Sequence, residues 1–303
     1  MTAVLTKAFA FVAIIAMGYI LKRVGFFHAK DFYLISNIVI KITLPAAIVS
    51  NFSKRTMDYS LLAMCVIGLL CNFVTIAVGY GINIRKPKET RAFAMLNMSG
   101  YNIGNFTMPF VQSFLSPVGF AATSLFDAGN SIMCTGMTFT LAGMVVGEDE
   151  KPSLPGMTKK LFSSIPFDAY IVMTILSILK LQLPAVMISF ADTAGGANAF
   201  LALLMLGIGF EIHMDREKIA QIVQILVMRY GIAVLMAVGF YFFAPFGLEV
   251  RQTLAIVSLG PVASIAPAFT GALNGDVEMA SAVNSLSIII SIAAITAALI
   301  ILL

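Results

Sequence analysis

The sequence predicts an all-α integral membrane protein in which ten transmembrane helices form a 5+5 inverted repeat. Of the 303 residues, 59% are hydrophobic and 11% are charged, whereas soluble globular proteins contain roughly 45–50% and about 25%. The apolar residues gather in segments long enough to cross a bilayer, and one hydrophilic stretch divides the chain near its middle. With so little charge to face water, most of the surface must face lipid, which argues against a soluble enzyme or a nucleic-acid-binding protein.

Each expected span holds about 20 apolar residues, the length that a helix needs to cross the hydrocarbon core. Charged residues, prolines or glycine-rich stretches bound the spans, which cover residues 3–21, 32–52, 59–83, 91–114, 118–146, 165–182, 184–210, 218–243, 251–272 and 277–301. The first has one early lysine and no small-residue cleavage motif, so we expect a retained helix rather than a signal peptide, with the protein starting at Met1.

Basic residues set the expected orientation. With the N-terminus outside, the inward loops carry twelve lysines and arginines and the outward loops carry four. The twelve are Lys22, Arg23, Lys30, Arg85, Lys86, Lys88, Arg91, Lys151, Lys159, Lys160, Arg216 and Lys218, and the four are Lys54, Arg55, Lys180 and Arg251. Basic residues concentrate in cytoplasmic loops. We therefore expect a multi-pass protein of the cell inner (plasma) membrane with both termini on the non-cytoplasmic side.

A hydrophilic loop at residues 148–160 predicts a cytoplasmic linker between two five-helix repeats, residues 1–147 and residues 161–303. Two repeats with an odd number of spans must be inserted in opposite orientations. A faint echo supports the repeat: TRAFAMLNMSG resembles VRQTLAIVSLG, which aligns Arg91 with Arg251 and Gly100 with Gly260. Chance identity in so biased a composition is the alternative explanation.

The fourth and ninth spans contain residues that interrupt helices, in the strings MLNMSGYNIGNFTMPF and SLGPVASIAPAF. Proline removes a helical hydrogen bond and glycine lowers helix propensity, so we expect both spans to unwind near the membrane midplane. Paired broken helices mark the binding sites of many transporters, and the N-termini of half-helices suit an anionic group. The expected substrate-binding residues are Asn97, Asn102, Gly104, Asn105, Pro109, Gly260, Pro261, Ser264 and Pro267. Ordinary proline kinks are the alternative.

The strings NIGNFTMP, LGPVASIAPAF and GDVEMASAVNSLSIIISI resemble the auxin efflux carrier family, as do LPAAIV and LLMLGIGF elsewhere in the chain. This family includes bacterial carriers of malonate and related carboxylates as well as the plant PIN proteins. The resemblance implies ten helices in an inverted repeat, with the fourth and ninth spans crossing. Thr107 and Met108 stand where the family motif often has a glycine before Pro109, and the long central loop of plant PIN proteins is absent.

Three charged residues fall near the centres of expected spans, where a charge costs about 2.5–3.5 kcal/mol on insertion scales. Asp127, with Asn130 nearby, offers oxygen ligands or a titratable group for a sodium ion or a proton. A structural ion pair with Lys41 or Arg229 is the alternative for Asp127. Lys41 is expected to pair with this carboxylate or to take a substrate carboxylate, and Arg229 to anchor helix packing.

Polar and small residues in two further spans extend the candidate site. The seventh span is predicted to form a substrate-facing wall or a site of close helix packing, because it contains Asp192, Gly195, Gly196 and Asn198. In the tenth span, Asn284 is expected to supply ligands together with Ser285 and Ser287. Cys65, Cys71 and Cys134 lie in apolar runs, which predicts buried thiols and neither a disulfide framework nor a metal site. Phosphate-loop and zinc-protease motifs are absent from the sequence.

Together these features predict a secondary active transporter, not an enzyme, that moves a mono- or dicarboxylate such as malonate by alternating access. We expect no cofactor, with a sodium ion or a proton as the coupling ion. The expected partners are the small organic anion and the lipid bilayer, without nucleic acid, and a homodimer is left open. The alternative is a cation/proton antiporter in which Asp127 exchanges ions and no organic substrate binds. A sensory or channel-like protein is disfavoured because nothing resembles a filter ring or a signalling domain.

Overall fold

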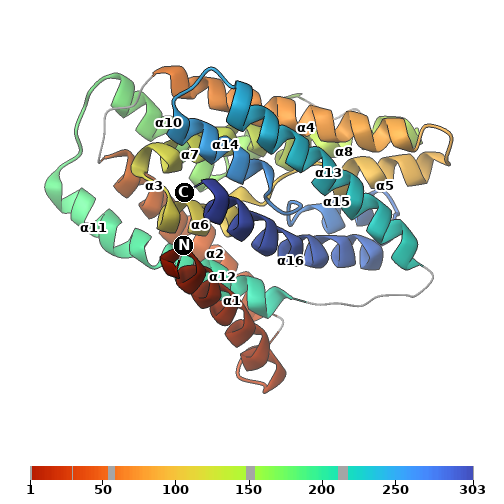
Figure 1. Ribbon diagram of the computed structural model, residues 1–303, viewed down its shortest axis with the longest axis horizontal. Helices are drawn as coiled ribbons and strands as arrows, with labels where there is room; N and C mark the ends of the chain where they lie inside the picture. Colours follow the sequence, from red (N-terminus) through yellow and green to blue (C-terminus); the bar gives the residue numbers. More distant parts are fainter. Residues whose placement is uncertain (1, 29, 54–58, 148–153, 211–217, 303) are drawn as a thin grey trace.

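The computed structural model describes residues 2–28, 30–53, 59–147, 154–210 and 218–302 as a chain of helices without strands (Figure 1). The basic residues Lys54, Arg55, Lys151 and Arg216 lie outside the described residues. The helices are α1 (Thr2–Arg23), α2 (Asp31–Ile38), η1 (Val39–Thr43), α3 (Leu44–Phe52), η2 (Tyr59–Leu62), α4 (Ala63–Ile82), α5 (Lys88–Met98), η3 (Ile103–Thr107), α6 (Met108–Phe114), α7 (Pro117–Ile132), η4 (Met133–Met137), α8 (Thr138–Val146), α9 (Leu154–Leu161), α10 (Ile165–Ile178), α11 (Ala185–Gly196), α12 (Asn198–Gly209), α13 (Ile219–Phe243), α14 (Leu248–Ser258), α15 (Ala266–Ala272) and α16 (Val277–Leu302).

Seven helical segments of the described chain are long and apolar enough to cross a membrane. They are Leu5–Arg23, Asp31–Phe52, Ser60–Ile82, Pro117–Val146, Ala185–Gly209, Ile219–Phe243 and Val277–Leu302. These match seven of the expected spans, and the expected sixth span is the shorter apolar helix α10, with 14 residues. The expected fourth and ninth spans are each interrupted, the fourth between α5 and η3 and the ninth between α14 and α15.

The linker predicted at residues 148–160 is helical over its described part. Its first six residues, 148–153, lie outside the described residues, and residues 154–160 belong to the helix α9. The second half of the predicted linker is therefore a helix and not a loop.

Two prolines inside expected spans, Pro45 and Pro109, do not break their helix. A π-helical turn, η1, precedes Pro45, and a second one, η3, precedes Pro109. A proline lacks an N–H donor and clashes with the carbonyl four residues before it. The wider π turn bonds each residue to the carbonyl five residues earlier, as Met108 does to Ile103, and so admits the proline. The fourth span is interrupted as expected, but the interruption lies before η3 and not at Pro109.

The helices pack in two groups. The small group comprises α1 to α3 and α10 to α12, in which α1 packs on α12 and α3 packs on α10 and α11. The large group comprises α4 to α8 and α13 to α16, in which α4 packs on α5 and α7, α13 on α14, and α15 on α16. Figure 1 shows the small group toward the left and the large group extending to the right. The interrupted segments lie within the large group.

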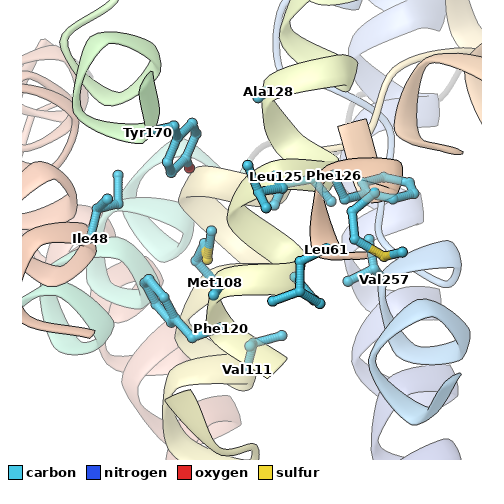
Figure 2. Close-up of a cluster of buried hydrophobic side chains, with 14 of the residues drawn as sticks. Ile48, Leu61, Met108, Val111, Phe120, Leu125, Phe126, Ala128, Tyr170 and Val257 are labelled. Atoms are coloured by element: carbon cyan, nitrogen blue, oxygen red, sulfur yellow. The ribbon is translucent and has the colours of Figure 1, made fainter. Parts of the chain in front are cut away.

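A cluster of buried apolar side chains joins the two groups (Figure 2). Ile48 of α3 and Tyr170 of α10 lie on the small-group side, opposite Met108, Phe120 and Leu125 of the large group. In a membrane, helices associate through close packing and hydrogen bonds because lipid is as apolar as the side chains. The boundary is therefore held mainly by shape, with few polar contacts.

Glycines set the closest helix contacts. A Cβ atom on Gly129 of α7 would meet the backbone carbonyl of Cys65, and a Cβ atom on Gly207 of α12 would meet the carbonyl of Ile15. Small residues of this kind let membrane helices approach each other at the backbone. The α4–α7 and α1–α12 contacts therefore depend on the absence of a side chain at these positions.

We expect Gly129→Ala to lower the thermal midpoint of the purified protein in detergent by several degrees. The added methyl group must push α4 away from α7, and overpacking of this kind costs about 1–3 kcal/mol. Gly231→Ala in α13 is the matched control, because nothing lies within 4 Å of its added Cβ and alanine favours a helix by about 1 kcal/mol over glycine. An equal midpoint for both variants would contradict the assigned α4–α7 contact.

Candidate functional site

The first interruption lies between the end of α5 and the start of η3, and two asparagines hold its backbone. Gly100 has φ +75°, a left-handed conformation that suits glycine. Its N–H donates to Asn72 Oδ1 at 2.7 Å. The Tyr101 N–H donates to Asn130 Oδ1 at 3.0 Å, and Asn130 Nδ2 donates back to the Tyr101 carbonyl at 2.9 Å. These side chains replace the helical hydrogen bonds that the interruption removes.

The second interruption lies between α14 and α15, and α16 supplies the corresponding bonds. Asn284 Nδ2 donates to the Val262 carbonyl at 3.0 Å, and the Val262 N–H donates to Ser287 Oγ at 3.1 Å. Ser291 Oγ donates to the Leu259 carbonyl at 2.7 Å. Asn284, predicted as an ion ligand, is therefore placed as a support of the backbone.

The two interruptions meet. Tyr101 and Val262 form an isolated antiparallel bridge, and the Asn102 N–H donates to the Pro261 carbonyl at 2.9 Å. Asn102 Nδ2 donates to Ser264 Oγ at 2.8 Å. Three predicted site residues, Asn102, Pro261 and Ser264, thus lie together although they are far apart in the sequence.

Arg229 of α13 lies beneath this contact with 1% of its surface exposed. Its guanidinium donates to the Met98 carbonyl, to the Gly100 carbonyl at 2.9 Å and to the Gly260 carbonyl at 3.1 Å. It also lies 4.9 Å from the centre of the Tyr101 ring. Met98 ends α5, and Gly260 follows the last residue of α14 by two positions. One buried cation therefore satisfies the negative ends of both leading half-helices, which confirms its expected structural role.

Asp127 of α7 is buried beside the start of the second half-helix. Its carboxylate accepts hydrogen bonds from Asn130 Nδ2 at 2.9 Å and from the Tyr170 hydroxyl at 3.0 Å. A Cβ atom built on Gly104 of η3 would lie 3.9 Å from Asp127 Oδ2. Gly104 therefore lets the carboxylate approach η3, and Asn130 links the carboxylate to the first interruption.

Lys41 does not pair with Asp127 in the described part of the chain. It lies in the π turn η1 and is exposed, whereas both partners of Asp127 are neutral donors. The face of this turn that contacts the protein carries the buried residues Val39 and Thr43 instead. The expected ion pair between Lys41 and Asp127 is thus not present.

The remaining predicted residues occupy different positions around the contact. Asn97 is fully buried and donates to Thr270 Oγ1 at 3.1 Å, so it joins α5 to α15. Pro267 lies in the first turn of α15, where a helix needs no N–H donor from it. Gly260 packs against Thr107, whose Oγ1 would lie 2.9 Å from an added Cβ.

Four amide atoms are buried and have no hydrogen-bond partner among the described residues. They are Asn97 Oδ1 in α5, Asn105 Oδ1 in η3, Gln112 Oε1 in α6 and Asn198 Nδ2 in α12. Elements η3 and α6 both pack against α12. Buried polar atoms are nearly always paired, so a group of unpaired ones indicates a place where a ligand or water completes the bonding.

The seventh span packs closely against the second. Gly195 lies against the backbone of Ala46 and Ala47, where an added Cβ would come within 2.6 Å of the Ala47 nitrogen. Thr43 Oγ1 donates to Asn198 Oδ1 at 3.0 Å, and Ser50 Oγ donates to Asp192 Oδ1. Of the two predicted roles, helix packing is seen for Gly195, while the unpaired Asn198 Nδ2 leaves a ligand-facing role open to test.

Sequence reasoning missed two residues that the structure brings to the site, Asn72 and Tyr170. Both lie in strongly apolar helices, α4 and α10. A single polar residue in an apolar span is the signal that would have indicated Asn72. Tyr170 gave no such signal, because tyrosine is common near membrane interfaces and its partner is 43 residues away.

Comparison with known proteins gives two matches. A family described as membrane transport protein matches residues 3–301, which is nearly the whole chain. An uncharacterized transporter from Methanothermobacter thermautotrophicus is 22% identical over 289 residues, covering 92% of this chain and 92% of the relative.

We expect Arg229→Gln to lower the thermal midpoint by several degrees and to reduce the yield of monodisperse protein. The change removes a cation that donates to three carbonyls, and hydrogen bonds to charged groups contribute about 1.5–3 kcal/mol each. Arg229→Lys should recover only part of the loss, because an ammonium group cannot reproduce the fork of donors. The control is Arg251→Gln, which removes a single bond to the Tyr241 carbonyl. A wild-type midpoint for Arg229→Gln would contradict this role.

Proposed function

The chain belongs to the membrane transport protein family, as its resemblance to the auxin efflux carriers predicted, and from this membership we propose that it is a secondary active transporter of a small organic anion. The substrate is a mono- or dicarboxylate such as malonate, moved by alternating access. The family consists of transporters rather than enzymes, and the long apolar helices make the chain a multi-pass membrane protein.

The observation that carries the anion assignment is the meeting of the two interruptions around Arg229. This cation satisfies the negative ends of α5 and α14. The second halves, which begin at η3 and α15, start with backbone N–H groups and a partial positive charge of about half an elementary charge. A carboxylate placed at these starts gains hydrogen bonds and a favourable dipole interaction.

Asn105 and Asn198 are the side chains that we assign to substrate recognition. Asn105 lies in the first turn of the second half-helix, and Asn198 begins the helix α12 that packs against it. Each has one buried amide atom without a partner among the described residues. Asn102 and Ser264 already bond to each other, so a substrate that contacts them must displace or share that bond.

Ten spans in two inverted repeats fit the interrupted helices. The segment D-A-G-N-S at residues 127–131 corresponds to S-A-V-N-S at residues 281–285. The asparagine of each segment, Asn130 or Asn284, holds the backbone of one interruption. Equivalent residues with equivalent contacts in two halves of a chain support an internal repeat, and five spans in each half require opposite orientations. The repeats are residues 1–147 and 161–303, in the inner membrane with both termini outside.

Coupling to a sodium ion or a proton is assigned to Asp127. A chain of hydrogen bonds runs from Tyr170 to Asp127, on to Asn130 and then to the Tyr101 backbone at the first interruption. Tyr170 belongs to the small group and Asp127 to the large group. A cation or proton bound at the Asp127 carboxylate changes the contact between Tyr170 and Asp127 and also the charge beside η3. Ion binding, substrate binding and the relative position of the two helix groups therefore become linked.

A cation/proton antiporter is the second candidate. The absence of a positively charged partner for Asp127 in the described residues favours it, because an unpaired carboxylate is free to exchange ions. Direct binding separates the two candidates. Carboxylates that raise the thermal midpoint of the purified protein support the anion carrier, whereas stabilisation by sodium or pH alone supports the antiporter. A flux screen over carboxylates in proteoliposomes then identifies the substrate.

We expect Asn105→Ala to fold like the wild type and to bind substrate about tenfold more weakly or worse. Its Oδ1 has no partner in the described structure, so truncation breaks no bond there, but it removes an amide whose NH₂ group can donate to a substrate carboxylate. Thermal-shift titration with the best transported carboxylate measures both properties. Asn37→Ala in α2 is the control, because this exposed amide bonds only within its own helix, to the Tyr33 carbonyl. Unchanged affinity in Asn105→Ala would remove it from the site.

We expect Asp127→Asn to abolish gradient-driven accumulation while exchange of substrate across the membrane persists. The amide keeps the shape of the carboxyl group but cannot carry its charge. Tyr170→Phe removes only a hydroxyl and should lower accumulation relative to exchange, and it should have no further effect in the Asp127→Asn background. Tyr101→Phe is the matched control for Tyr170→Phe, because the buried Tyr101 hydroxyl has no partner among the described residues. Full accumulation by well-folded Asp127→Asn protein would contradict the coupling assignment.

A further inference from the structure

A groove between α1 and α16 is lined by apolar side chains and has a volume of about 390 Å³. Val12, Ala16 and Tyr19 line it from α1, Ile289 and Ala293 line it from α16, and Phe210 closes it beyond α12. Figure 1 shows α1 and α16 leaving the region of the two chain ends in different directions. The groove lies between these two helices, and its lining includes no residue of the two interruptions and neither Asp127 nor its hydrogen-bond partners.

Two basic residues lie at the Tyr19 end of this groove and are held by residues that line it. The Arg23 guanidinium lies 5.3 Å from the centre of the Tyr19 ring, and its Nε donates to the Tyr19 hydroxyl at 3.0 Å. Lys22 Nζ donates to the Phe210 carbonyl at 2.9 Å. The Tyr19 and Phe210 rings pack edge to face, 6.0 Å apart. A positive charge is thus fixed at the end of an apolar channel, in the last turn of α1.

We propose that this groove binds an anionic phospholipid, with one acyl chain between α1 and α16 and the phosphate at Arg23. The apolar lining excludes water and suits a hydrocarbon chain, and α1 and α16 are both spans whose outer surfaces face lipid. The exposed Arg23 side chain supplies the complementary charge at the depth where the span ends. Tyrosine at the same level suits the interface between hydrocarbon and headgroup.

The bound lipid bridges the two helix groups, because α1 belongs to the small group and α16 to the large group. Binding at this place therefore stabilises their present arrangement, since a ligand favours the arrangement that it contacts. This site does not depend on the identity of the transported substrate.

The test uses the purified full-length protein, delipidated in detergent, with phosphatidylglycerol or phosphatidylcholine of the same acyl composition. Native mass spectrometry counts bound lipids, and thermal-shift titration gives the apparent affinity. We expect the wild type to bind phosphatidylglycerol in preference to phosphatidylcholine. Arg23→Gln should reduce that preference about fivefold, the contribution expected of one basic residue near a headgroup, while Arg85→Gln, another exposed arginine, should not.

A second pair of variants tests the groove without changing any charge. Ala16→Phe fills it and should abolish the preferential binding, whereas Ala13→Phe, at an exposed position of the same helix outside the groove, should not. Equal binding of both lipids to the wild type would overturn the proposal. Wild-type lipid preference in both Arg23→Gln and Ala16→Phe would also overturn it. So would an Ala16→Phe mass spectrum in which the protein has lost a second copy of the chain and not a lipid.

Discussion

Backbone polar groups inside a membrane must be satisfied by the protein, and the structure is organised around the two places where helices fail to do this. Each interruption exposes N–H and C=O groups at depth, where an unpaired group costs several kcal/mol. Asn72 and Asn130 form hydrogen bonds with the backbone of the first interruption, and Asn284 and Ser287 do so with the backbone of the second. The interruptions also pair with each other through Tyr101 and Val262. The helices that carry these side chains, α4, α7 and α16, therefore have to pack where they do.

Arg229 compensates the partial charges at one pair of half-helix ends but not at the other pair. Two leading half-helices bring their negative ends together, and a guanidinium with three carbonyl acceptors holds them. A neutral side chain could bond to one of these carbonyls, but it would leave the converging dipoles uncompensated. Among the described residues no charged side chain bonds to the start of α15, whereas Asp127 lies beside the start of η3. This difference supports the anion site and the coupling role of Asp127 that we propose.

The boundary between the two helix groups is mostly apolar, and few polar contacts cross it. Lys7 Nζ of α1 donates to the Ser113 carbonyl of α6 at 2.8 Å. Gln112 Nε2 donates to the Gly195 carbonyl at 3.1 Å, and Tyr170 donates to Asp127. An apolar boundary with few directional bonds allows two groups to adopt different relative positions at low cost, because each position offers similar packing. The polar contacts then decide which position is favoured. The lipid groove lies at the same boundary but at its outer surface.

Composition and the length of apolar runs determined the class of the protein, because lipid imposes the same requirement on every spanning helix. The strings around Asn102 and Pro261 located both interruptions, since glycines, asparagines and prolines clustered within a few residues lower helix propensity. The role of Pro109 followed from local structure that periodicity does not show, because a π turn admits it. Only the tertiary structure decided that Asp127 bonds to Tyr170 rather than to Lys41, that Arg229 joins three carbonyls and that Asn72 supports Gly100. Such partners lie tens to more than a hundred residues apart, and helix rotation and packing bring them together, whereas a sequence pattern records only what happens within a few turns.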